Sequence, residues 1–311
     1  MNVATPAIEV RQLRKTYRGT TALDGVDLTV GTGEIFGILG PNGAGKTTTV
    51  EIIEGLTSPD SGSVHVLGID PFADRDALRQ VLGAQLQESR LPAKLRVREA
   101  VKLYASFYPD PVPVDEMLER VGLTDKRSTP FEGLSGGQQQ RLSIALALVG
   151  RPKVAILDEV TTGLDPTARR AMWQTILDLR DSGLTVVLIT HFMEEAERLC
   201  DRVALMRGGR IVATDTTGGI IESTVGGQRV TFDVAGRVPV ADLERLPGVT
   251  GVEVDGSTVH VLGRGDLVTA ITGALHGWGV GYERVRVHQG TLDDAFLQLT
   301  GTAAGRTEED R

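Results

Sequence analysis

A glycine-rich run that carries a single lysine is the first stretch whose residue types and spacing suit chemistry. Residues 40–47 read Gly-Pro-Asn-Gly-Ala-Gly-Lys-Thr, which fits G-x-x-x-x-G-K-[ST]. Glycines let backbone N–H groups turn inward around a phosphate, where a Cβ would clash, and the Lys46 ammonium can neutralise neighbouring phosphates. The Thr47 hydroxyl can ligate magnesium. A chance match is the alternative in a chain with 38 glycines. Because the run follows an apolar strand and opens a helical stretch, we expect a nucleotide-phosphate cradle.

Two carboxylates and a histidine stand at the ends of apolar runs. Asp158 and Glu159 close the run 154–159, and His191 follows the run 185–190. Continuous apolar runs are typical of parallel strands buried on both faces, and their carboxyl ends form the ligand-binding edge of such a sheet. Asp158 then suits magnesium, and Glu159 suits polarising an attacking water. An acidic strand end is common and a lone histidine is more often structural. Together with the strand that leads into the glycine-rich run, however, three strand ends converge on one phosphate, which favours hydrolysis.

A second anion-facing segment lies at residues 134–141, Leu-Ser-Gly-Gly-Gln-Gln-Gln-Arg. Ser135 suits the N-cap of the long helical stretch that follows, and the two glycines leave backbone amides and the helix dipole facing outward. Two phosphate cradles in one chain imply either a second nucleotide or one that is shared.

With these motifs, the sequence resembles the ATP-binding subunit of an ABC transporter over residues 8–215. Residues 40–48 match the family's Walker A motif and residues 134–141 its signature. Residues 154–159 match Walker B with the catalytic glutamate, residues 161–166 match the D-loop, and His191 matches the switch histidine. The stretch 190–211 and an added C-terminal domain resemble the ATPase subunits of daunorubicin-type drug-resistance exporters.

The resemblance implies the following site. Catalytic roles fall to Glu159, His191 and Gln87, and magnesium ligation to Thr47, Gln87 and Asp158. Nucleotide contacts fall to Tyr17, Gly40, Pro41, Asn42, Gly43, Ala44, Gly45, Lys46, Thr47, Thr48, Ser135, Gly136, Gly137 and Asp165.

Two of these assignments have competitors. Tyr17 stands where the family stacks an aromatic ring on adenine, and a buried strand tyrosine is the alternative. Gln87 resembles the Q-loop glutamine, with Gln85 as the nearby competitor.

The resemblance also answers the question of the second cradle. In the family, the signature of one subunit closes over the ATP of the other, so Ser135 and Gly137 act in trans and Asp165 lies at the interface of a homodimer. Val160 replaces the proline usual after the glutamate, and Arg96 stands where threonine or serine is common. Neither departure touches a group that hydrolysis needs, so activity is expected to survive.

The fold that the resemblance implies is α/β: a P-loop NTPase with a RecA-like core, an antiparallel β subdomain and a helical signature subdomain. We expect the ATP-binding domain over residues 1–222, with its helical subdomain at about 90–150, an accessory domain over 223–300 and a disordered tail over 301–311. Residues 228–288 alternate in the order β-α-β-β-α-β, which is typical of a ferredoxin-like α+β domain.

Composition limits which partners and which cellular compartment we expect for this chain. The net charge of −8 disfavours nucleic acid, and the single cysteine, Cys200, excludes an internal disulfide, suits a reducing cytoplasm and is expected to be a packed, inert side chain. The N-terminus lacks the apolar stretch of a secretory signal, and no apolar run approaches the roughly 18–20 residues that cross a bilayer. The chain itself is not expected to span a membrane, and the resemblance to a transporter subunit implies a peripheral protein at the cytoplasmic face of the membrane.

The leading hypothesis is an ATPase that powers a separate integral-membrane permease, an exporter of drugs or other small hydrophobic molecules. The alternative is a soluble ABC ATPase that is not coupled to transport and acts on DNA or ribosomes. One cassette, the absence of heptads and the negative charge disfavour it. A nucleotide-binding regulator is disfavoured by Glu159.

Overall fold

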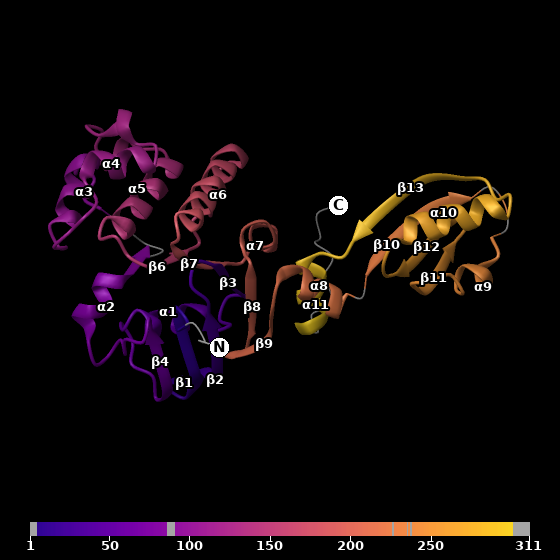
Figure 1. The fold of residues 1–311 in the computed structure, drawn as a ribbon, viewed down its shortest axis with the longest axis horizontal. Helices are drawn as coiled ribbons and strands as arrows, with labels where there is room; N and C mark the ends of the chain where they lie inside the picture. Colours follow the sequence, from indigo (N-terminus) through magenta and orange to yellow (C-terminus); the bar gives the residue numbers. More distant parts are fainter. Residues whose placement is uncertain (1–4, 86–90, 226, 235, 237, 301–311) are drawn as a thin grey trace. The chain divides into compact units, whose positions relative to one another are not determined.

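The computed structural model describes residues 5–85, 91–225, 227–234, 236 and 238–300. The chain separates into two compact units, Met1–Thr217 and Gly218–Arg311 (Figure 1). No helix of the described residues is long and apolar enough to span a bilayer.

A six-stranded sheet forms the centre of the first unit. Its strands, in spatial order, are β5 (Leu82–Gln85), β6 (Val154–Asp158), β7 (Thr185–Thr190), β3 (Ile35–Leu39), β8 (Arg202–Arg207) and β9 (Arg210–Asp215). All neighbouring pairs are parallel except β8 and β9. Every residue of β3 and β7 is buried, which confirms that the apolar runs are interior parallel strands.

Two helices connect neighbouring segments of this sheet: α6 (Pro166–Asp181) lies between β6 and β7, and α7 (Met193–Leu199) lies between β7 and β8. Helix α1 (Lys46–Ile53) follows β3 and leads out of the sheet. Helix α6 begins where its sequence dictates, because Asp165 caps it and Pro166 occupies its first turn. It links β6 to β7 as the crossover of a βαβ unit.

An antiparallel sheet, with strand order β2-β1-β4, packs into the same core. It comprises β1 (Ile8–Tyr17), β2 (Thr20–Val30) and β4 (Ser61–Val66), and the short helix α2 (Arg75–Val81) follows. Alternate apolar residues such as Ile8, Val10 and Val26 join Ile52 and Ile53 of α1 in one hydrophobic cluster.

The remaining helices of this unit form a cluster of their own. They are α3 (Val97–Ala105), α4 (Val114–Arg120) and α5 (Gly136–Leu148), with 3-10 turns at Thr124–Lys126 and Phe131–Gly133. The run Leu142–Leu148 is buried within α5. Core, antiparallel sheet and helical cluster confirm the predicted P-loop architecture.

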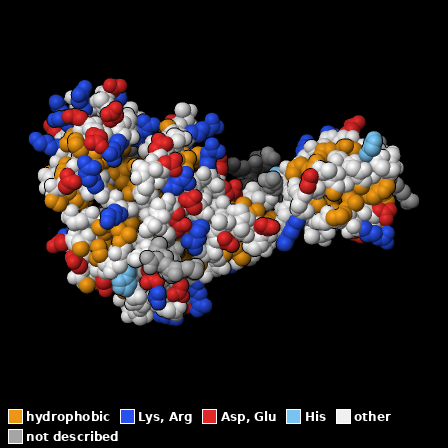
Figure 2. All heavy atoms as spheres, viewed as in Figure 1, with side chains coloured by type: hydrophobic (Ala, Val, Ile, Leu, Met, Phe, Trp, Pro, Cys, Tyr) orange, Lys and Arg blue, Asp and Glu red, His pale blue; other side chains and the backbone are white. Residues whose placement is uncertain are grey.

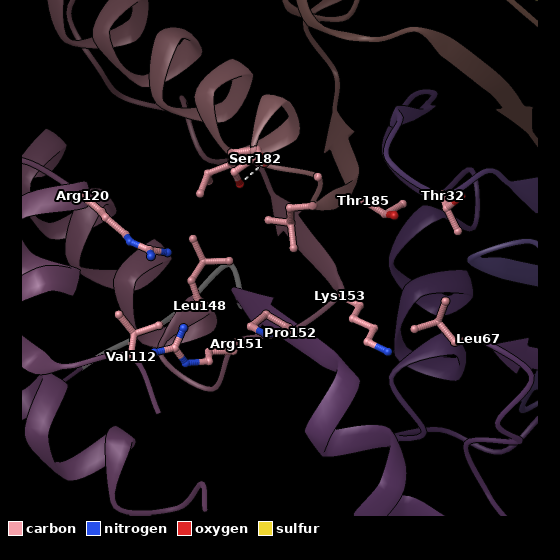
Figure 3. Close-up of a pocket in the computed structure, with 13 residues that line it drawn as sticks. Thr32, Leu67, Val112, Arg120, Leu148, Arg151, Pro152, Lys153, Ser182 and Thr185 are labelled. Atoms are coloured by element: carbon pink, nitrogen blue, oxygen red, sulfur yellow. Dashed lines mark hydrogen bonds between the residues drawn. The ribbon is translucent and has the colours of Figure 1, made fainter. Parts of the chain in front are cut away.

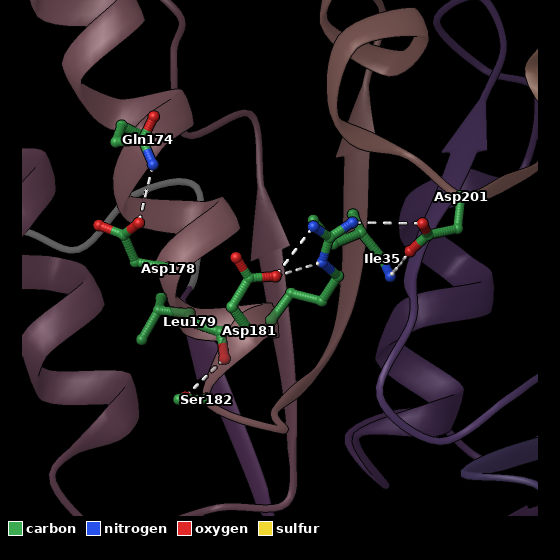
Figure 4. Close-up of polar contacts among 8 residues, drawn as sticks. Ile35, Gln174, Asp178, Leu179, Asp181, Ser182 and Asp201 are labelled. Carbon is green, nitrogen blue, oxygen red and sulfur yellow. Dashed lines mark hydrogen bonds and ion pairs between the residues drawn. The ribbon is translucent and has the colours of Figure 1, made fainter.

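Polar contacts fasten the amino end of β3. Asp201 accepts from the Ile35 backbone N–H (2.8 Å) and from Arg180 (3.3 Å), and Arg180 also contacts Asp181 (Figure 4). Together these contacts join the last turn of α6 to the start of the central strand.

The second unit is an α+β domain. Its elements are α8 (Thr217–Thr224), β10 (Gln228–Val234), α9 (Val240–Leu243), β11 (Val249–Asp255), β12 (Thr258–Gly263), α10 (Leu267–Gly277), β13 (Tyr282–Gln289) and α11 (Leu292–Thr300). The spatial order β11-β12-β10-β13, antiparallel throughout, is the ferredoxin-like order that the sequence predicts.

This unit has its own hydrophobic core. Val230, Phe232 and Val261 of the sheet pack with Leu267 and Ile271 of α10. Edge strand β13 is different, because its apolar residues are exposed: Tyr282 by 37%, Val285 by 37% and Val287 by 44%. Apolar side chains are accordingly prominent on the surface of this unit (Figure 2), whereas charges of both signs interleave over the first unit.

Candidate active site

The glycine-rich loop lies between β3 and α1 and wraps around a buried ammonium. Lys46, the first residue of α1, is 6% exposed, and its Nζ donates to the carbonyls of Gly40 (2.8 Å) and Pro41 (3.1 Å). A Cβ at Gly40 would lie 2.4 Å from the Met206 carbonyl oxygen, and one at Gly45, where φ is +104°, would lie 2.8 Å from the Ala22 carbonyl oxygen. Only glycine fits at either position, so the tight loop required for a phosphate cradle is present.

The outer residues of this loop face solvent. Pro41, Asn42, Gly43 and Thr47 are exposed, and Thr48 is half-buried, whereas Ala44 packs inside. A polyphosphate can therefore approach the loop from outside, where helix α1 presents the positive end of its dipole.

Asp158 and Glu159 lie within electrostatic reach of that lysine. Burial raises the pKa of Asp158 to about 6, the charge of Glu159 adds to the increase, and Lys46 opposes it. Burial lowers the pKa of Lys46, and both carboxylates oppose that shift. One buried cation and two neighbouring carboxylates thus meet at the carboxyl end of β6.

Glu159 sits on a strained backbone. Its φ of +49° is in the left-handed region, which costs a residue other than glycine about 1–2 kcal/mol. Its N–H donates to the Ile189 carbonyl (2.9 Å), and its Oε1 lies 2.9 Å from Nδ1 of His191. Strained residues of this kind cluster at functional sites. The turn places the Glu159 carboxylate directly beside His191, the residue that follows β7.

The second cradle starts helix α5. Ser135 is the N-cap, its hydroxyl accepting from the Gln138 N–H (3.4 Å), while the Gln138 side chain accepts from the Ser135 N–H (3.1 Å). This capping box confirms the predicted N-cap. Ser135 and Gly136 are exposed, and a Cβ on Gly136 would contact nothing within 4 Å. An anion therefore has room at this helix start.

Comparison with known proteins agrees with this geometry. Residues 23–162 match the family model described as ABC transporter. The chain is 36% identical to daunorubicin resistance ATP-binding protein DrrA3 of Streptomyces coeruleorubidus, over 96% of this chain and 97% of that protein. It is 35% identical to Nod factor export ATP-binding protein I of Ralstonia nicotianae, over 96% of this chain and 95% of that one. The chain belongs to the ABC transporter family, as one of its ATP-binding proteins.

Solved structures of the family show the same cassette. An ATP-binding subunit of an ABC transporter superposes with a TM-score of 0.64 at 28% identity, covering 71% of this chain and 93% of that one. A dimeric post-hydrolysis state of an ATP-binding cassette bound to ADP and Pi superposes with a TM-score of 0.61 at 29% identity, covering 67% and 98%. The predicted fold class and the predicted ATPase activity are confirmed: this ABC protein binds and hydrolyses ATP.

Three further residues were predicted for the site of this ABC ATPase: Asp165, Tyr17 and Gln87. Asp165 caps α6, accepting from the N–H groups of Thr167 (2.9 Å) and Ala168 (3.0 Å). Tyr17, at the end of β1, is 42% exposed, so the alternative of a buried strand tyrosine is wrong. Gln87 lies outside the described residues, and Gln85 is buried at the end of β5, so the choice between them stays a prediction.

Three side chains around this site of the ABC ATPase were not predicted from the sequence. The Phe192 ring lies against His191, and Arg169 lies over the Phe192 ring. Glu54, at the end of α1, is close enough to Asp158 to be repelled by its charge. Phe192 is adjacent to a predicted residue, but nothing in the sequence shows that Arg169, 23 positions earlier, meets its ring. Cys200 is packed as predicted, with burial raising the pKa of its thiol.

A cavity of about 370 Å³ lies at the other end of strands β6 and β7, where their amino ends are (Figure 3). Lys153 and Thr185, at the amino ends of β6 and β7, line it together with Arg120 and Arg151. Asp158 and His191 stand at the carboxyl ends of the same strands, so this cavity is separate from the nucleotide-binding residues.

Proposed function

We propose that this ABC ATPase drives a separate integral-membrane permease and exports drugs or other small hydrophobic molecules. It acts at the cytoplasmic face of the membrane as a peripheral subunit. The support is near full-length similarity to two proteins whose names describe export or drug resistance. Because these relatives align over the C-terminal unit as well as the cassette, the similarity is not confined to the motifs that ABC ATPases share.

The contact between Glu159 and His191 carries the hydrolytic assignment. A carboxylate held 2.9 Å from an imidazole, at the edge where the γ-phosphate would lie, is placed to polarise an attacking water. In this proposal Glu159 is the base and His191 fixes its orientation. Gln87 completes the catalytic set.

The phosphate loop binds the nucleotide. Lys46 and the backbone amides of residues 40–48 hold the phosphates, and Tyr17 stacks on the adenine. Thr47, Asp158 and Gln87 would hold Mg²⁺, which neutralises phosphate charge when bound. These oxygen donors fit magnesium, which proteins hold through one or two carboxylates together with substrate phosphates. The charge of Mg²⁺ would also offset the desolvation of Asp158.

The functional form is a homodimer with ATP sandwiched between the subunits. Ser135, Gly136 and Gly137 contact the partner's nucleotide, and Asp165 lies at the interface. The support is the exposed helix start at Ser135, together with the dimeric arrangement named for a related cassette.

Glu159→Gln tests the catalytic assignment. The amide keeps the side chain's shape but is a poor base, so we expect ATP affinity within about twofold of wild type and turnover lowered about 10²–10⁴-fold. The closed dimer should accumulate with ATP. Binding of a fluorescent ATP analogue, phosphate release and size-exclusion chromatography measure the three properties. Turnover near wild type would remove Glu159 from its proposed role.

Transport coupling needs a cell-based test. The chain is co-expressed with a multi-span membrane protein encoded beside it in a drug-sensitive host, and daunorubicin accumulation is followed by fluorescence. We expect lower accumulation with wild type than with Glu159→Gln, and recovery of the ATPase in the membrane fraction only with its partner. Equal accumulation and no membrane association would favour an ABC ATPase that is not coupled to transport.

A further inference from the structure

Phe192 lies between the His191 imidazole and a cation from another helix. The ring centroids of His191 and Phe192 are 4.0 Å apart and inclined by 40°, and Cζ of Arg169 lies 5.3 Å from the Phe192 centroid. His191 in turn contacts Glu159 at 2.9 Å. The four side chains thus form a continuous series from helix α6 to the carboxylate.

Arg169 uses the ring in place of a hydrogen-bond acceptor. Its Nε is buried, and among the described residues it has no hydrogen-bond partner. Its backbone N–H donates to the Asp165 carbonyl (2.9 Å), which fixes it in the first turn of α6. A guanidinium held over an aromatic face is attracted by the ring quadrupole, and more strongly when it is shielded from water.

The backbone beside the ring is also fixed. The Phe192 N–H donates to Oγ1 of Thr190 (3.0 Å), and Thr190 is fully buried at the end of β7. Helices α6 and α7 are joined separately by the Trp173 indole N–H, which donates to Glu195 (3.2 Å) inside the protein. The Arg169–Phe192 contact is therefore not needed to hold the helices together.

We propose that Arg169 and Phe192 are positioning residues for ATP hydrolysis: their stack fixes the His191 imidazole in the orientation that holds the Glu159 carboxylate. This inference rests on the proposed roles of Glu159 and His191. The His191 side chain is 39% exposed, so solvent surrounds part of the imidazole and protein contacts restrain only the rest of it. Phe192 provides one of these contacts, and Arg169 holds Phe192.

Four substitutions test the series in the full-length protein. Arg169→Met keeps the length of the side chain and removes its charge, and Phe192→Leu removes the ring. We expect each to lower kcat about 10–100-fold, because small misplacement of a catalytic group has that effect, with ATP affinity unchanged. Arg169→Lys and Phe192→Tyr, which keep the cation and the ring, should retain kcat within about threefold of wild type. If kcat falls as far in these conservative variants as it does in Arg169→Met and Phe192→Leu, the proposal is wrong.

Trp173→Phe is the matched control. It removes the buried donor to Glu195, so thermal stability should fall, while kcat at 25 °C should stay within about twofold because the His191 stack is untouched. If kcat falls in this variant as it does in Arg169→Met, general loosening of the α6–α7 contact explains the effect and the proposal is wrong.

A spectroscopic readout reports the imidazole directly. NMR signals of the His191 ring, assigned with His191→Gln among the five histidines, should move in Arg169→Met although Phe192 is still present. Unchanged signals together with unchanged kcat would refute the positioning role. Failure of the proposed function looks different, because Glu159→Gln would then retain turnover. An inactive Glu159→Gln beside fully active Arg169→Met and Phe192→Leu overturns only the positioning inference.

Discussion

At the scale of single residues, Glu54 is held in surroundings that disfavour its charged form. It lies at the end of α1, largely buried, and burial together with the charges of Asp158 and Glu51 raises its pKa from 4.5 to about 7. The folded state therefore holds a proton on Glu54 at pH values where the unfolded chain has released it. Its ionisation opposes folding.

Replacing Glu54 by Gln should change how stability depends on pH. Between pH 4.5 and 7 the folded wild type binds more protons than the unfolded chain, so its stability falls as pH rises and the loss is complete above 7. The difference in unfolding free energy, Glu54→Gln minus wild type, should therefore rise across this window by up to about 3 kcal/mol and then level off.

The measurement is urea denaturation between pH 5 and 8 in a Trp278→Phe background, where fluorescence of Trp173 reports on the ATP-binding unit. Glu119→Gln, an exposed substitution on α4, is measured beside it as the control for replacing a surface glutamate by glutamine. A difference for Glu54→Gln that does not change with pH would contradict the raised pKa of this carboxyl.

The part of the site that could be predicted from the sequence consists of residues that lie in a recognisable motif or at the end of an apolar run. Lys46, Asp158, Glu159 and His191 were found because apolar runs identify parallel strands, and such strands present their carboxyl ends at one edge. Glu54, Arg169 and Phe192 were missed because their importance depends on which side chain lies opposite in space. In the sequence, Phe192 looks like any apolar residue before a helix. Only the folded position of α6 shows that Arg169 lies over its ring.

At the scale of elements, the start of α5 combines two roles in Ser135. It caps the helix through the Gln138 amide and, in our proposal, faces the partner's ATP. Aspartate caps as well as serine does, whereas alanine does not. Ser135→Asp should keep stability within about 0.5 kcal/mol but place a carboxylate against the nucleotide phosphates, so that ATP-dependent dimerisation and turnover are lost.

Ser135→Ala completes the comparison. It should cost about 1 kcal/mol of stability through the lost cap, and it should impair turnover less than Ser135→Asp because no repulsive charge is introduced. Denaturation and phosphate release measure both variants. If Ser135→Asp dimerises with ATP and turns over normally, this helix start does not face a nucleotide.

The fold was more predictable than the site at this scale. Strand and helix order in both units followed from apolar runs, turn residues and the motif resemblance, and the order β-α-β-β-α-β sufficed for the ferredoxin-like topology. The exposure of β13 was not predictable. Its residues alternate Val285 and Val287 with charges, as a half-buried strand would, and only the sheet order reveals that it is an edge strand.

At the scale of the whole molecule, mixed dimers test whether the signature acts in trans. Lys46→Ala damages the phosphate loop and Ser135→Asp damages the signature, so each mutant homodimer has two damaged sites. A mixed dimer of the two collects both lesions in one site and leaves the other whole. ATPase activity should therefore return on mixing. If the two sites act independently, each mixed dimer should hydrolyse ATP at up to about half the rate of a wild-type dimer. No return despite subunit exchange, followed by energy transfer between labels, would contradict shared sites.

The C-terminal unit offers a second test at this scale. Its core is its own, and the phosphate-loop, carboxylate and signature residues all precede Gly218. A chain ending at Thr217 should bind ATP within about twofold of the full chain, because no nucleotide contact is removed.

We propose that this unit strengthens the homodimer through the exposed apolar residues of β13, so the truncated chain should need higher concentrations to dimerise. Val285→Lys in the full-length chain is the companion variant and should weaken dimerisation without removing the unit. Sedimentation measures both. If the truncated chain folds but loses ATP affinity, the C-terminal unit contributes to the nucleotide site. If dimerisation is unchanged in both variants, the unit does not strengthen the homodimer.

The position of β3 has a consequence for how the protein is made. This central strand leads directly into the phosphate loop, yet its neighbours β7 and β8 are synthesised much later. At about 5–20 residues per second, the roughly 150 residues between them leave β3 without its partners for about 8–30 s on the ribosome. During that time the nascent chain carries a fully apolar strand with nothing to pair with, which is a target for chaperones. The capacity to bind ATP therefore arrives late in translation, although the motif responsible for it is among the first to emerge.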